Sequence, residues 1–294
     1  MRDKAGILIR TVIILIGLGI LVYPSLSEYL QQKNASRAVA KYDDTVRRTE
    51  HEQLDLLLEQ AQDYNSMLAS AYGARATADV PSDNCVSLDS YSDLLNIDGD
   101  GMIGYITIPS LSTTDRIFHN TDEAVLQSGI GHLKTTSLPV GGESTHVVLI
   151  GHRGLPTAEL FTDLDKLSVG DQFYIRVLDR TLCYTIDRIE TVLPDEMDDI
   201  SIESGEDYTT LVTCTPYGVN SHRLLVRGVR TPFDDSMEIP IYENDLGSWW
   251  TRLPAQYRHM LIGAGVIIVF LIVWLTIGRI RNNTAKQQIR SRNV

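Results

Sequence analysis

The chain has 294 residues, 43% of them hydrophobic, and a formal net charge of −12 at pH 7. This length is enough for one sizeable domain with a buried core. The acidic balance argues against nucleic acid as a partner, because phosphate binding requires a basic surface. The charge is uneven, since residues 1–10 and 279–294 are basic whereas the segment between them is acidic. Basic ends around an acidic centre are typical of a chain flanked by membrane segments.

Two apolar segments lie near the ends of the chain, at residues 5–23 and 260–278. As a helix each would be roughly 28 Å long, close to the hydrocarbon thickness of a bilayer. We therefore expect an N-terminal transmembrane anchor within residues 1–23 and a second transmembrane helix at 260–278. The first segment could instead be a cleaved signal peptide. Its long apolar stretch and the lack of a small-x-small cleavage site favour an uncleaved anchor.

The basic flanks predict the orientation of these two spans. The positive-inside rule places both termini, including the basic tail 279–294, in the cytoplasm. Residues 24–259 would then lie outside the cell, held at the membrane. A linker at 232–259 ends near Trp249 and Trp250, a residue type that favours the membrane interface.

The first segment after the anchor, residues 24–72, is predicted to be helical. From position 25 it lacks proline and glycine, and it spaces apolar residues along one face: Leu54, Leu57, Leu58, Ala61, Tyr64, Met67 and Leu68. This pattern predicts an amphipathic pair of helices packed on the domain. The following loop region, 73–101, is long, and such loops are usually functional or mobile.

Residues 102–231 consist of short β-branched runs separated by turn residues. Phe173, Ile175 and Val177 alternate with polar or amphipathic neighbours, and residues 178–180 are expected at a hairpin turn. Many strands at this spacing predict an antiparallel barrel or sandwich.

Three cysteines, Cys85, Cys183 and Cys214, make an odd number, so at least one thiol should be free. So few cysteines in an extracellular domain are not a disulfide scaffold. Cys183 falls inside a predicted strand pair, where we expect it to pack.

No metal site and no cofactor are expected. The stretch NIDGDGMIG resembles the start of a calcium loop, but Thr107 stands where a bidentate glutamate is required, which predicts a solvated turn. The histidines and cysteines lack the spacing of a zinc site. His132 and His146 are expected to be structural.

The stretch TLVTCTPYGVNSHRLLVRG, residues 210–228, places Cys214 at the end of one strand and Arg223 at the start of the next. A connection this short leaves the strand ends adjacent. His152 directly follows another apolar run, THVVLIG. The three residues could supply a nucleophile, an acid/base and an oxyanion clamp. From spacing alone, a buried packing cysteine, a loop histidine and an ion-paired arginine remain open alternatives.

The blocks MIGYITIPSL, STHVVLIGHRG and TLVTCTPYGVNSHRLLVRG, in this order, resemble the sortase transpeptidases, most closely the pilin-polymerising class C enzymes. The resemblance runs from about residue 64 to 230. It implies a mainly β fold, an eight-stranded sortase barrel with N-terminal helices and a lid loop, flanked by two transmembrane helices. It implies Cys214 as nucleophile, His152 as acid/base, Arg223 as oxyanion and substrate clamp, and Thr213 as part of the peptide groove.

The same resemblance implies the reaction and its partners in a Gram-positive envelope. Cys214 would cleave an LPXTG-like sorting signal of a surface protein between Thr and Gly. A lysine amine of the next pilin would then resolve the thioester and extend a covalent pilus. The alternatives are a sortase that anchors proteins to peptidoglycan and a non-catalytic scaffold that binds pilins.

Class C sortases carry a lid with an Asp-Pro-aromatic motif. Its best equivalent here is Asp83, Asn84 and Cys85, where the proline is absent and a thiol replaces the ring. We expect Asp83 to pair with Arg223 and Cys85 to lie over Cys214. A disulfide between Cys85 and Cys214 would form a redox lock. The alternative is that the lid is shifted or lost.

Overall fold

The computed structural model describes residues 2–75, 88–155, 158–196, 200–234, 237, 239–242, 263 and 265. The chain divides into two compact units, Met1–Glu243 and Asn244–Val294, and the elements described below belong to the first. They are, in chain order, α1 (Arg2–Arg48), α2 (His51–Arg75), η1 (Leu88–Asp93), β1 (Met102–Ile108), η2 (Pro109–Leu111), β2 (Thr113–His119), α3 (Glu123–Leu126), β3 (Ile130–His132), β4 (Thr145–Ile150), η3 (Leu164–Lys166), β5 (Gln172–Val177), β6 (Arg180–Val192), β7 (Asp207–Thr215) and β8 (His222–Thr231).

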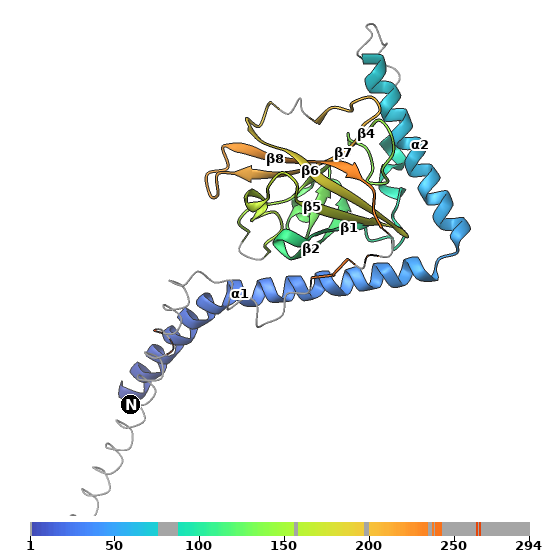
Figure 1. Cartoon of the computed structure of the whole chain (residues 1–294). Helices are drawn as coiled ribbons and strands as arrows, with labels where there is room; N and C mark the ends of the chain where they lie inside the picture. Colours follow the sequence, from blue (N-terminus) through green and yellow to red (C-terminus); the bar gives the residue numbers. More distant parts are fainter. Residues whose placement is uncertain are drawn as a thin grey trace, which may run out of the picture. The chain divides into compact units, whose positions relative to one another are not determined.

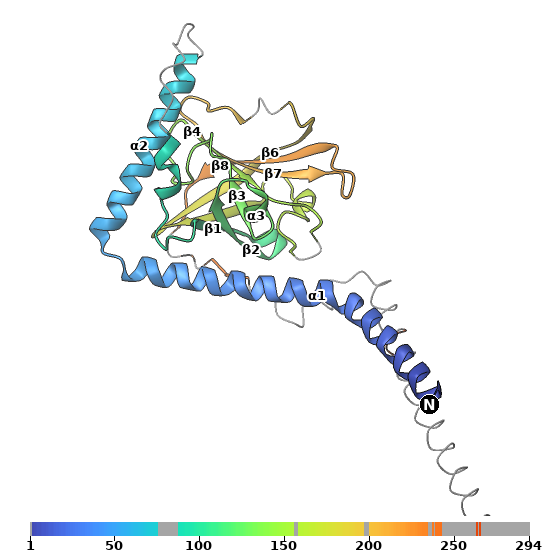
Figure 2. The same ribbon diagram turned by 180° about the vertical axis from the view of Figure 1, so that it is seen from behind.

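The eight strands close into one barrel in the order β1-β2-β3-β4-β7-β8-β6-β5 (Figures 1 and 2). The expectation of an eight-stranded barrel is confirmed. The barrel differs from the antiparallel one that the strand spacing predicts. β2 pairs with β3, and β4 with β7, in parallel. A parallel pair needs a crossover connection. Between β4 and β7 the crossover contains the whole β5–β6 hairpin, and for this reason spacing along the sequence did not reveal the pairing.

The alternation of apolar and polar residues in β5 determines which face of the strand points into the barrel. Phe173, Ile175 and Val177 have no exposed surface and lie in the main hydrophobic core. The hairpin turn falls where the sequence predicts it, with Leu178 at a φ of 49° between β5 and β6. Cys183 in β6 is 2% exposed, so the expectation that it packs is confirmed.

Helices α1 and α2 pack against the outside of the barrel (Figures 1 and 2). One buried residue of α1 is Tyr42, which has no exposed surface. Its hydroxyl donates to the carbonyl of Ile103 in β1 (3.1 Å) and accepts from the N–H of Leu178 (2.8 Å). The tyrosine therefore joins α1 to two points of the barrel wall. The desolvated phenol stays neutral, because burial raises its pKa strongly.

The predicted pair of helices is confirmed, with a break at residues 49–50. Five members of the predicted apolar face of α2 are buried: Leu54, Leu58, Ala61, Tyr64 and Leu68. Leu57 is partly buried against the same core. The inclusion of Met67 was wrong, since its side chain is 51% exposed. Met67 lies at the edge of the helical face, where the apolar stripe is too wide to be fully covered.

Helix α2 also holds the connection between β3 and β4. The Tyr64 hydroxyl donates to the Lys134 carbonyl (2.7 Å). The Asn65 amide donates to the Leu138 carbonyl (3.0 Å) and accepts from the Leu138 N–H (2.7 Å). These contacts satisfy buried backbone groups that have no strand partner. The connection is therefore fixed from outside the barrel, ahead of β4.

His132 and His146 have structural roles, as the sequence analysis expects. His132 donates through Nε2 to the Ser137 carbonyl (2.7 Å), and its Nδ1 accepts from the Tyr91 hydroxyl (2.6 Å). Burial lowers the pKa of His132 to about 4. His146 donates through Nδ1 to the Ser201 carbonyl (2.8 Å). Its pKa is also lowered by burial.

The turn before β1 is tied to α1. Asp98 accepts from the Thr45 hydroxyl (2.8 Å) and lies 3.2 Å from Lys41 Nζ. Asp100 accepts from the Met102 N–H (3.1 Å), and Asn96 from the Gly101 N–H (3.0 Å). The acidic residues of this turn thus have helix and backbone partners. Among the residues that the structure describes, no group of three or more His, Cys, Asp or Glu could hold a metal ion.

The described residues cover the two predicted membrane segments to different extents. The anchor at 1–23 falls almost wholly within α1, whereas 260–278 lies outside the described residues except for 263 and 265. Among the helices that the structure describes, none combines the length and the apolar character that a membrane crossing requires. Both spans remain predictions.

His132 predicts a pH dependence of stability. Its pKa falls from about 6.5 in the unfolded chain to about 4 in the fold. Between these values the unfolded chain binds a proton that the folded protein does not, so acidification destabilises the wild type at this site. We expect the advantage of the wild type over His132→Gln in free energy of unfolding to narrow from pH 7 to pH 5. The limit is about 1.4 kcal/mol per pH unit.

Denaturant titration at several pH values measures this difference, and groups common to both proteins cancel in it. His51→Gln, at an exposed position of α2, is the control. A wild-type advantage over His132→Gln that stays constant across this range would contradict the neutral, buried assignment.

Candidate active site

The site is built at the ends of β4, β7 and β8. In the parallel pair, Ile150 of β4 is the register partner of Val212 in β7. The Gly151 N–H donates to the Val212 carbonyl (3.0 Å), so the two strands stay in step past the end of β4. Continuing this register places His152 level with Cys214. A residue from the β4–β5 connection is thereby brought to the candidate nucleophile.

Cys214 and Arg223 are register partners in the antiparallel pair of β7 and β8. Directly opposed residues of such a pair project from the same face of the sheet. Cys214 is a free thiol of intermediate burial. The Arg223 Nη1 donates to the carbonyls of Asn220 (3.3 Å) and His222 (3.1 Å), which orients the guanidinium. The strand register therefore opposes Cys214 to Arg223, and its continuation from β4 places His152 at the same level.

The His152 side chain is 28% exposed, yet its Nε2 atom is buried and has no hydrogen-bond partner among the described residues. The nearest acidic atom is Oε1 of Glu123 in α3, at 3.7 Å, which is beyond hydrogen-bonding distance. Glu123 is itself 72% exposed, so solvent screens this pair. A buried ring nitrogen without a partner is uncommon in a fold, and contact with a bound ligand is one explanation for it.

Thr213 takes a position different from the one that a groove residue would have. Its side chain is 1% exposed, and its hydroxyl donates to the Gly151 carbonyl (2.8 Å). The residue links the ends of β7 and β4 directly behind the site. Contact between Thr213 and a bound peptide therefore stays a prediction.

The β4–β5 connection adds residues to the site that the sequence analysis did not single out. Arg153 donates from Nη1 to the Thr215 hydroxyl (3.0 Å) and pairs with Asp165. Gly154 has a φ of +80°, and a Cβ there would lie 2.7 Å from the Tyr217 ring. The ring thus lies against bare backbone. The sequence shows Arg153 only as part of the block GHRG. It predicts no role for this residue, because its partners are remote along the chain.

The lid residues Asp83, Asn84 and Cys85 lie outside the described residues. The pairing of Asp83 with Arg223 and the disulfide between Cys85 and Cys214 therefore remain predictions.

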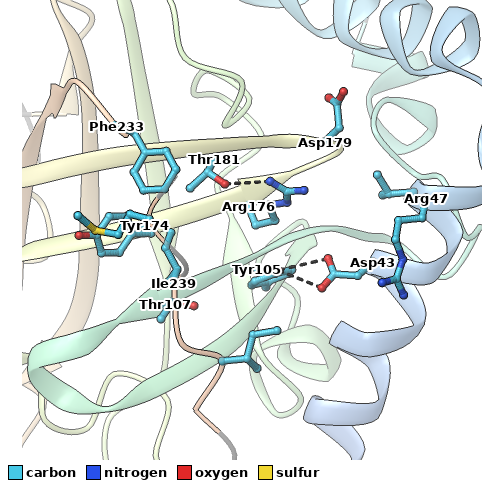
Figure 3. A pocket seen from close by; sticks show the side chains of 13 residues that line it. Asp43, Arg47, Tyr105, Thr107, Tyr174, Arg176, Asp179, Thr181, Phe233 and Ile239 are labelled. Carbon is cyan, nitrogen blue, oxygen red and sulfur yellow. Dashed lines mark hydrogen bonds between the residues drawn. The ribbon is translucent and has the colours of Figure 1, made fainter. Parts of the chain in front are cut away.

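A cavity of about 540 Å³ lies on the outside of β1 and β5, across the barrel from β4 and β7. Figure 3 shows its polar side chains making contacts among themselves. Asp43 accepts from the Tyr105 hydroxyl (3.2 Å), and Arg176 donates to Thr181 (2.9 Å). Among the described residues its lining contains no cysteine or histidine, so the described part of this cavity is separate from the candidate active site.

Comparison with known proteins agrees with this geometry. A family model described as "Sortase domain" matches residues 106–231. Curated relatives include Sortase A of Bacillus anthracis, 29% identical over 133 residues, and Sortase D of Bacillus subtilis strain 168, 28% identical over 130 residues. These alignments cover 45% and 43% of this chain and 61% and 63% of the relatives. The chain thus spans about three fifths of the length of the curated relatives it matches.

Two solved structures are more similar. Sortase C1 from Streptococcus agalactiae is 44% identical with a TM-score of 0.60, and the match covers 67% of this chain and 100% of that one. Sortase C of Streptococcus pneumoniae is 42% identical with a TM-score of 0.59, covering 67% of this chain and 97% of that one. With class C sortases among its structural neighbours, the chain belongs to the sortase family of cysteine transpeptidases.

Proposed function

We propose that this protein is a class C sortase that cleaves an LPXTG-like sorting signal and joins the released acyl group to a lysine amine of a pilin. The observation that carries the proposal is the meeting of His152, Cys214 and Arg223 at three adjacent strand ends. These side chains supply the three roles that acyl transfer through a thioester needs.

In the first half-reaction the Cys214 thiolate attacks the carbonyl carbon of the threonine in the sorting signal. Negative charge develops on the carbonyl oxygen, and we assign its stabilisation to the Arg223 guanidinium. The imidazolium of His152 donates its proton to the leaving glycine amine. The C–N bond breaks, and the acyl group remains on Cys214 as a thioester.

In the second half-reaction an amine replaces the leaving group. The lysine amine attacks the thioester carbonyl, His152 takes up the amine proton, and the Cys214 thiolate leaves. The product is an isopeptide bond. Exclusion of water around the thioester favours an amine over hydrolysis.

The pilin as partner is supported by the structural neighbours. The structure of the Streptococcus pneumoniae sortase C was presented with insights into pilin substrate specificity. A peptidoglycan amine as acceptor, the reaction of an anchoring sortase, is the competing assignment. The two differ only in the amine, so the acceptor has to be tested directly.

The proposed location is the cell membrane, with the barrel outside and both termini in the cytoplasm. The support is the apolar composition of 5–23 and 260–278 with their basic flanks. Several apolar side chains in the first part of α1 are also exposed, namely Val12, Ile13, Leu15, Ile16 and Ile20. Exposed apolar surface of this kind needs a partner or a lipid environment.

A lid formed by residues 83–85 is proposed to cover the site. A lid mutant is known for Streptococcus agalactiae sortase C1, one of the structural neighbours. The partly exposed thiol of Cys214 is a target that such a lid would protect.

Cleavage of a fluorogenic LPXTG-type peptide tests the nucleophile and the acid/base. We expect Cys214→Ala to abolish cleavage, because the substitution removes the thiol that would carry the acyl group. His152→Ala should lower kcat/KM by roughly 10²- to 10⁴-fold, the usual contribution of a general acid. Cys183→Ala, which alters a buried cysteine of β6, is the matched control and should retain activity. Undiminished cleavage by Cys214→Ala would reject the proposed function.

The acceptor is tested by mass spectrometry of the products formed with two competing amines. One is a lysine-bearing pilin peptide and the other is a peptidoglycan stem peptide. We expect the isopeptide product with the pilin lysine to dominate. Preference for the stem peptide would identify an anchoring sortase instead.

Arg223→Lys tests the oxyanion clamp. Lysine keeps the charge but loses the planar fork of donors, so the substitution is not conservative at such a site. We expect kcat to fall about 10²-fold with a smaller change in KM. Arg180→Lys, at an exposed position of β6, is the control. Equal kinetics for Arg223→Lys and the wild type would exclude Arg223 from this role.

A further inference from the structure

The proposed acid/base and nucleophile lie on two strands that are far apart along the sequence. The last backbone hydrogen bond between β4 and β7 among the described residues is that from the Gly151 N–H to the Val212 carbonyl. His152 and Cys214 lie just beyond it. Beyond this bond, side-chain contacts link the two segments.

One such contact lies immediately before the pair. The Thr213 hydroxyl donates to the Gly151 carbonyl at 2.8 Å, and the bond is buried. Thr213 precedes Cys214 by one residue, and Gly151 precedes His152 by one residue. We call this contact the inner bracket. It gives a hydrogen-bond partner to the Gly151 carbonyl, which lies just past the end of β4.

A second contact lies immediately after the pair. Arg153 Nη1 donates to the Thr215 hydroxyl at 3.0 Å. Arg153 follows His152 by one residue, and Thr215 follows Cys214 by one residue. We call this contact the outer bracket. The two brackets thus enclose His152 and Cys214 between them on both strands.

The outer bracket is anchored in the fold. The Arg153 side chain is only 8% exposed, and its Nη2 lies 2.5 Å from Oδ2 of Asp165 in η3. The preceding residue, Leu164, has no exposed surface and belongs to the hydrophobic core. The charge-assisted bond to Asp165 fixes the guanidinium plane while the other nitrogen holds Thr215.

We propose that Thr213, Arg153 and Thr215 are positioning residues that set the distance and orientation between His152 and Cys214. The inference rests on the proposed function, because it assigns these residues a role in that reaction. Proton transfer and nucleophilic attack depend steeply on geometry, so a displacement of about 1 Å can lower the rate 10²-fold. Neither bracket touches the reacting atoms.

The test removes single hydrogen bonds with little change in shape. Thr215→Val and Thr213→Val delete the hydroxyls, and Thr215→Ser and Thr213→Ser restore them. We expect each valine variant to lower kcat for the LPXTG-type peptide by roughly tenfold to a hundredfold. KM should change less than threefold, and the serine variants should recover most of kcat. Arg153→Met should resemble Thr215→Val.

Two contacts of the same chemistry elsewhere in the barrel are the matched controls. Arg176 donates to Thr181 (2.9 Å) on the far wall of the barrel, shown in Figure 3, and Thr145 donates to the Gly142 carbonyl (2.7 Å) at the start of β4. Thr181→Val and Thr145→Val should leave kcat within twofold of the wild type. Thermal unfolding of all variants separates a general loss of stability from a loss confined to kcat.

The bracket proposal is overturned if the valine variants keep wild-type kcat, if serine does not rescue, or if the controls lose kcat equally. Failure of the proposed function gives a different result, namely no cleavage by the wild type or cleavage by Cys214→Ala. In that case the rate at which iodoacetamide alkylates Cys214 is measured as a function of pH, in a Cys85→Ser background. This measurement tests the bracket proposal without any peptide substrate. We expect a shifted pH profile in Thr215→Val, because the coupling of the thiol to His152 changes. An unchanged profile rejects the proposal.

Discussion

The parallel pairing of β4 with β7 is the constraint on which the site depends. It carries the register from Thr145↔Asp207 to Ile150↔Val212 and brings the residue after β4 level with Cys214. The antiparallel pairing of β7 with β8 adds Arg223 at the same level. Two different strand pairings therefore converge on one thiol. Shifting either register by one residue would turn the corresponding side chain to the opposite face of the sheet.

The rest of the fold holds this arrangement from outside. Tyr42 of α1 joins β1 to the β5–β6 turn, and Tyr64 and Asn65 of α2 fix the connection that leads into β4. His132, buried and neutral, links that connection to η1 through Tyr91. Each of these polar side chains is buried with partners, and buried polar groups with satisfied hydrogen bonds rigidify a structure. The helices that precede the barrel thus form part of its scaffold.

Much of this could be predicted from the sequence, where local pattern decides the outcome. The alternation of apolar and polar residues predicted which face of β5 is buried, and apolar residues at helical spacing predicted α2. Positions at strand ends singled out Cys214, His152 and Arg223. The parallel pairings could not be predicted, because both depend on barrel closure and the strands β4 and β7 are separated by the whole β5–β6 hairpin. Arg153 was missed for the same reason, since its partners Thr215 and Asp165 meet it only in the fold. Thr213 was expected in the groove, but its buried contact to Gly151 is visible only in three dimensions.

The central claim is that Cys214 forms the acyl bond beside His152. It is tested most directly by mixing the protein with an LPXTG-type peptide without an amine, quenching in acid and mapping the adduct by mass spectrometry. Cleavage after Arg188 and Arg223 by trypsin yields the fragment 189–223, in which Cys214 is the only cysteine. We predict that this fragment carries the acyl group and that His152→Ala accumulates far less of it. Peptide turnover with the acyl group on another fragment, or with no adduct at all, would contradict the assignment.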